Sequence, residues 1–171
     1  YFFMPGILRR HLLLNLATHN PVTALVLLHT VRLFSLQAGL PLGAIRWRPV
    51  LLLVVMNWAL VFAWEISRKI RSAVEEDAYV TYSRILGRAG AVALAGGAQT
   101  ASLVLAVGLF GQLRVSWLPV AVLAVGYSAT LAGHLRFLAQ PCPRTSRLKP
   151  LAERYFVCVC LAAISAAIFS P

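Results

Sequence analysis

The sequence predicts an all-α protein, a polytopic transmembrane helix bundle of about five spans that forms a single membrane domain over residues 1–171. Three observations support this fold class. Hydrophobic residues make up 60% of the chain and charged residues only 12%, whereas about a quarter of a typical soluble domain is charged. Several apolar runs approach the roughly 20 residues that a helix needs to cross a bilayer. The charged residues collect between those runs.

The predicted spans are helices because a spanning helix satisfies its own backbone hydrogen bonds, whereas a barrel would alternate apolar and polar residues. Residues 1–20 combine several leucines with Arg9, Arg10 and His11. That pattern is typical of a helix lying in the membrane interface or of a connection to an earlier span. The five spans are expected at residues 21–40, 49–66, 89–111, 115–138 and 155–170.

The chain has a net charge of +11. The distribution of its basic residues among the loops predicts the orientation of the spans. Basic residues before the first span, in the 67–88 loop and in the loop before the last span share one side, while Arg46, Arg48 and Arg114 lie on the other. Because cytoplasmic loops carry the excess of Lys and Arg, we expect the 67–88 loop to face the cytoplasm. The expected location is the cell (inner) membrane, and no nucleic acid partner is expected.

Four of the five acidic residues lie in one short stretch beside five basic residues, which indicates a functional site. Carboxylates bind Mg²⁺ together with substrate phosphates, and Arg or Lys can neutralise the remaining phosphate charge. The alternative interpretation is structural: i,i+3 and i,i+4 ion pairs at the first acidic residue, followed by a solvated acidic loop. The acidic residues are Glu65, Glu75, Glu76 and Asp77, and the basic residues are Arg68, Lys69, Arg71, Arg84 and Arg88.

The sequence Thr-Tyr-Ser-Arg-Ile-Leu-Gly at residues 81–87 enters an apolar span after this acidic segment. With the Glu-Ile-Ser-Arg-Lys-Ile-Arg run at residues 65–71, it resembles the second motif region of the UbiA-type intramembrane prenyltransferases. The resemblance implies a helical membrane enzyme of nine spans, of which this chain matches the last five. It also implies that the protein uses Mg²⁺ to transfer a prenyl group from a prenyl diphosphate to an aromatic or other lipophilic acceptor.

The resemblance implies a role for each charged residue of the stretch. Glu65 and Glu75 are expected to bind metal and act in catalysis, and Glu76 and Asp77 are expected to be further metal ligands. Arg68, Lys69 and Arg71 are expected to bind the diphosphate. Asn57 lies near the middle of the second span. It is expected either to line the substrate cavity or to form a hydrogen bond between helices.

Two departures from the family pattern shape the functional prediction. Lys69 follows Glu65 where the family's Asp-x-x-x-Asp has its second acid, and the family's first motif, Asn-Asp-x-x-Asp, has no counterpart. The chain is therefore expected to be inactive without a missing N-terminal half of the same protein. The rival prediction is a non-enzymatic membrane subunit or small transporter whose charged cytoplasmic loop binds anionic lipid or a partner.

Overall fold

A computed structural model describes residues 11–76 and 81–169, and in these two ranges the chain is helical without strands. The all-α prediction is therefore confirmed for the described residues. In chain order the elements are α2 (Leu12–His19), α3 (Pro21–Gln37), the 3₁₀ turn η1 (Leu42–Ala44), α4 (Trp47–Ser67), the 3₁₀ turn η2 (Ala73–Glu75), α5 (Tyr82–Gln112), α6 (Trp117–Ala139) and α7 (Lys149–Phe169).

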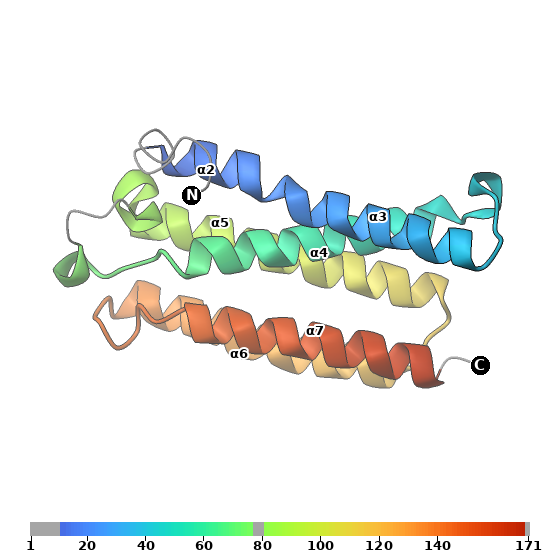
Figure 1. Cartoon of the computed structure of the whole chain (residues 1–171). Helices are drawn as coiled ribbons and strands as arrows, with labels where there is room; N and C mark the ends of the chain where they lie inside the picture. Colours follow the sequence, from blue (N-terminus) through green and yellow to red (C-terminus); the bar gives the residue numbers. More distant parts are fainter. Residues whose placement is uncertain (1–10, 77–80, 170–171) are drawn as a thin grey trace.

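The long helices run side by side along one axis, and successive long helices reverse direction (Figure 1). The connection between α4 and α5 and the loop between α6 and α7 lie at one end of the bundle, together with α2. We call this end the loop end. The connections α3–α4 and α5–α6 lie at the opposite end, as the alternating directions of five predicted spans require.

Three helices within the described residues, α4, α5 and α6, are long and apolar enough to cross a membrane. A membrane location is thus plausible on length and composition. The count of five spans stays a prediction, since α3 and α7 overlap the predicted first and last spans but do not belong to this set of three.

Two helices begin earlier in the chain than predicted. Helix α5 begins at Tyr82 rather than near residue 89, because the Thr81 hydroxyl accepts a hydrogen bond from the Arg84 backbone N–H and caps the helix. Helix α7 begins at Lys149 rather than near residue 155. Pro150 suits its first turn, where a backbone N–H has no intrahelical partner. Both differences place charged residues on helices rather than in loops.

Gly87 interrupts α5 shortly after it begins. Its φ of 70° and ψ of 164° are non-helical, and φ values in this region are strained for residues with a side chain. The helix therefore consists of a short first turn and a long membrane-length segment. The break lies in the motif at residues 81–87 and positions the basic residues on either side of it.

A hydrophobic cluster at the loop end ties α2 to the rest of the bundle. Leu12 and Leu16 of α2 are buried against Ile66, Tyr82 and Phe137. The described part of the predicted interfacial segment is thus a helix with one side in the core. A second cluster packs α4 to α7 together nearer the opposite end, with Leu60, Leu123, Tyr155 and Val159 among its buried members.

Candidate functional site

Glu65, the first predicted metal ligand, is engaged in ion pairs at the end of α4. Arg68 binds both carboxylate oxygens, with its Nη2 2.8 Å from Oε1 and its Nε paired with Oε2. Lys69 Nζ lies 3.1 Å from Oε1. These are the i,i+3 and i,i+4 pairs of the structural alternative. Two residues expected to bind diphosphate therefore neutralise the carboxylate expected to bind metal.

Lys69 also connects the end of α4 to the start of α5 through its contacts with Tyr82. Only 4% of its surface is exposed, its carbonyl accepts a hydrogen bond of 3.1 Å from the Tyr82 N–H, and its ammonium lies 6.0 Å from the centre of the Tyr82 ring. On the outer side of α4, the Arg68 guanidinium lies 5.4 Å from the Trp64 ring, within cation–π range. Both basic side chains thus have structural partners.

Glu75, the second predicted metal ligand, closes the η2 turn. Its Oε2 accepts hydrogen bonds from the Ser72 N–H at 3.1 Å and from the Ser72 hydroxyl at 2.6 Å. The Ser146 hydroxyl, from the α6–α7 loop, donates a third at 2.5 Å. Burial raises the pKa of the Glu75 carboxyl, but these hydrogen bonds and the charge of Arg71 outweigh it, so the pKa lies below its ordinary value.

Glu76 accepts a hydrogen bond from the Thr81 hydroxyl, which lies 2.7 Å from each carboxylate oxygen. Since Thr81 also caps α5, Glu76 braces the start of that helix. Asp77, the remaining predicted metal ligand, lies outside the described residues.

The described carboxylates do not form a ready metal site. Within residues 11–76 and 81–169, no three His, Cys, Asp or Glu side chains come close enough together to hold a metal ion. Glu65, Glu75 and Glu76 each bind a different set of protein donors. As arranged, they do not fit a shared Mg²⁺ ion, and the Mg²⁺ requirement stays a prediction.

A basic pocket of about 260 Å³ lies at the α4–α5 connection; we call it the α4–α5 pocket. Among the described residues, its cations are Arg71, Arg84 and Arg88, and Glu76 is the one carboxylate that lines it. The Arg71 guanidinium donates to the carbonyls of Arg68 and Ile70, at 3.3 and 3.0 Å. The remaining polar lining comes from Ser72 and Ser83.

Of the residues predicted to bind diphosphate, Arg71 lines this pocket, and Arg68 and Lys69 do not. Arg84 and Arg88 were not predicted to line a site with Arg71, because residues 82–88 were expected to lie in a loop and not at the start of α5. A signal was present: Thr81 precedes Arg84 by three residues, the spacing at which a cap accepts a backbone hydrogen bond.

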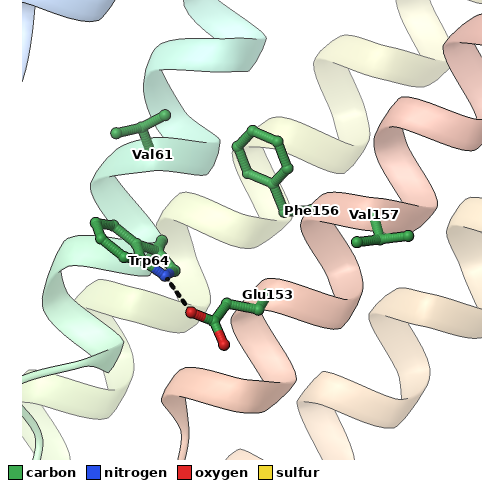
Figure 2. Close-up of a pocket in the computed structure, with 5 residues that line it drawn as sticks. All are labelled: Val61, Trp64, Glu153, Phe156 and Val157. Atoms are coloured by element: carbon green, nitrogen blue, oxygen red, sulfur yellow. Dashed lines mark hydrogen bonds between the residues drawn. The ribbon is translucent and has the colours of Figure 1, made fainter.

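An apolar pocket of about 410 Å³ lies between α4 and α7, and Figure 2 shows the five residues that line it. Val61, Phe156 and Val157 form its walls with Trp64, whose indole N–H donates a hydrogen bond of 3.2 Å to Glu153. Asn57 is half-buried in α4 and lines neither this pocket nor the α4–α5 pocket. Its predicted cavity role stays untested.

No protein-family model matches this chain, and no match was found among curated proteins or solved structures.

Proposed function

We propose that this chain is the diphosphate-binding part of an integral-membrane prenyltransferase of the UbiA type, acting on a prenyl diphosphate and an aromatic or other lipophilic acceptor. The observation that supports this most is the α4–α5 pocket, where Arg71, Arg84 and Arg88 surround a space of about 260 Å³. The motif at residues 81–87 contributes Arg84, Arg88 follows it directly, and Arg71 ends the run at residues 65–71.

The chemistry of prenyl transfer explains why arginines suit this position. When the allylic C–O bond breaks, negative charge develops on the departing diphosphate, and positively charged donors stabilise it. A guanidinium can bind two phosphate oxygens at once through parallel N–H donors. In this proposal Arg71, Arg84 and Arg88 replace the sequence-predicted set of Arg68, Lys69 and Arg71.

The lipophilic acceptor is proposed to enter through the apolar pocket between α4 and α7 that Val61, Trp64 and Phe156 line. Its walls are apolar, as a site for a membrane-soluble molecule requires. Glu153 supplies a polar group beside Trp64, and the Arg68 guanidinium against the Trp64 ring connects this pocket to the charged end of α4. The acceptor would thus approach from the membrane while the diphosphate approaches from the loops.

Glu65, Glu75 and Glu76 each bind protein donors in this arrangement and do not share a site for Mg²⁺. The resemblance implies that a first acidic motif in the N-terminal half of the protein completes the enzyme. The protein that should bind and transfer the prenyl group is therefore the longest form that its gene encodes.

Binding of farnesyl diphosphate by that protein in detergent, compared with farnesol, tests the proposal. We expect Arg71→Gln and Arg88→Gln each to weaken farnesyl diphosphate binding roughly tenfold, because each removes a charge-assisted hydrogen bond worth about 1.5 kcal/mol. Farnesol binding should not change. Arg48→Gln, an exposed arginine at the opposite end of the bundle, is the control.

Equal losses in the control variant and the pocket variants would reject the pocket as the diphosphate site. Prenyl transfer by the wild-type protein, measured with and without added Mg²⁺, tests the metal requirement separately. Absence of transfer, with intact diphosphate binding, would leave a binding protein rather than an enzyme.

The second candidate function is a non-enzymatic membrane subunit or small transporter whose charged loop binds anionic lipid or a partner. One observation favours it: Glu65, Glu75 and Glu76 are all occupied by protein donors. This candidate predicts binding of anionic ligands that is independent of Mg²⁺, without selectivity for a prenyl chain and without transfer.

A further inference from the structure

A second basic pocket lies between α6 and α7 at the loop end of the bundle, and we call it the α6–α7 pocket. It has a volume of about 430 Å³ and shares no lining residue with the α4–α5 pocket. In the part of the chain that the structure describes, four arginines line it and no acidic side chain does. They are Arg136 from α6, Arg144 and Arg147 from the α6–α7 loop, and Arg154 from α7.

The charge of this pocket is not balanced by the described part of the protein. The ion pairs among the described residues join Glu65 to Arg68 and Lys69, and Glu153 to Lys149. None involves the four arginines. All four side chains are exposed, so they are accessible to a ligand. Four like charges around one cavity repel one another, and an anion bound among them would offset that repulsion.

The other wall of the pocket is apolar and belongs to the helices. Ala129, Ala132 and Gly133 contribute from α6, and Leu151 contributes from α7. The helices approach closely here: a Cβ atom at Gly133 would lie 2.1 Å from Leu151 Cδ1, so the Leu151 side chain would have to move to make room for it. Because α6 is long and apolar enough to span a membrane, this wall leads from the charged loop toward the bilayer core.

We propose that the α6–α7 pocket binds an anionic phospholipid, with the arginines on the headgroup phosphate and an acyl chain along the wall of small residues. Basic pockets at the ends of membrane helices suit anionic headgroups, since each Arg near an anionic membrane surface contributes about 1 kcal/mol. A soluble phosphate would use the arginines but not the apolar wall. The site is independent of the function proposed above, because its residues do not line the α4–α5 pocket.

The test is lipid binding by the purified full chain in detergent, measured by native mass spectrometry with phosphatidylglycerol or phosphatidylcholine of the same acyl chains. We expect the wild type to prefer phosphatidylglycerol. The double variant Arg144→Gln/Arg147→Gln should lower that affinity roughly 30-fold, from two lost arginine contributions. Its phosphatidylcholine affinity should be unchanged. Arg144→Lys/Arg147→Lys keeps the charge and should lose less than about tenfold.

The matched control is Arg46→Gln/Arg48→Gln, which removes two exposed arginines from the opposite end of the bundle. It should retain wild-type affinity for phosphatidylglycerol. Unchanged affinity in the Arg144/Arg147 variant, or an equal loss in the control, overturns the proposal. Inorganic phosphate binding as tightly as phosphatidylglycerol overturns the lipid assignment in favour of a free anion site. Unchanged thermal unfolding of each variant in the same detergent verifies that the fold is retained.

Discussion

The Ser146 hydroxyl donates a 2.5 Å hydrogen bond to Oε2 of Glu75, although the two residues lie 71 positions apart in the chain. This contact joins the α6–α7 loop to the α4–α5 connection. The same carboxylate oxygen accepts from Ser72 and holds the η2 turn. Glu75, which the family resemblance predicts to be a metal ligand, is thus the link between the two loops that carry the basic pockets.

Removing the Ser146 hydroxyl should loosen this link. Ser146→Ala leaves a partly buried carboxylate with one donor fewer, so the free energy of unfolding should fall by about 1–2 kcal/mol. Chemical unfolding in detergent measures the change. Ser116→Ala is the control, because Ser116 is exposed and its side chain makes no capping hydrogen bond. Similar losses in the two variants would argue against a special role for the Ser146 contact.

Lowering the pH should reduce the free energy of unfolding, partly because Glu75 becomes protonated. Folding lowers the pKa of its carboxyl below the ordinary value of 4.5, so its contribution to stability is present above that pH. The contribution is lost as the pH falls through the lower, folded-state pKa. Glu75→Gln should therefore be less stable than the wild type at neutral pH, and the difference should shrink on acidification. Unfolding curves between about pH 7 and pH 3 measure it, and a constant difference would contradict the prediction.

Glu65 and Lys69 should show energetic coupling. Glu65→Gln removes the carboxylate that pairs with the buried Lys69 ammonium, and we expect a loss of about 2–3 kcal/mol in unfolding free energy. The double variant Glu65→Gln/Lys69→Met removes both charges and should recover part of this loss. A double-mutant cycle should give a coupling energy of about 0.5–3 kcal/mol. Strict additivity would show that the ion pair does not stabilise the fold.

Gly87 should be sensitive to substitution for a backbone reason alone. No atom lies within 4 Å of a Cβ added there, but its φ of 70° disfavours any residue with a side chain. Gly87→Ala should therefore destabilise the protein by about 1–2 kcal/mol. Gly97→Ala is the matched control, since a Cβ there also meets open space and its backbone is helical. A neutral Gly87→Ala variant would mean that the break in α5 is not required.

The local properties of the chain could be predicted from the sequence. Apolar runs of membrane length and a low charge content determined the helical class, and helical spacing allowed the Glu65 pairs with Arg68 and Lys69 to be foreseen as an alternative. These features depend on neighbours within about one turn of a helix. The starts of α5 and α7 were misplaced because Thr81 and Pro150 extend each helix into charged sequence that hydropathy assigns to loops.

The tertiary structure alone decided which distant residues meet. It joined Ser146 to Glu75, placed Arg71 with Arg84 and Arg88 in one pocket, and gathered the α6–α7 arginines in another. The physical reason is that charge and periodicity act along one element, whereas these contacts depend on the order in which antiparallel helices pack. Packing determines which loops share an end of the bundle, and therefore which carboxylates and arginines become neighbours.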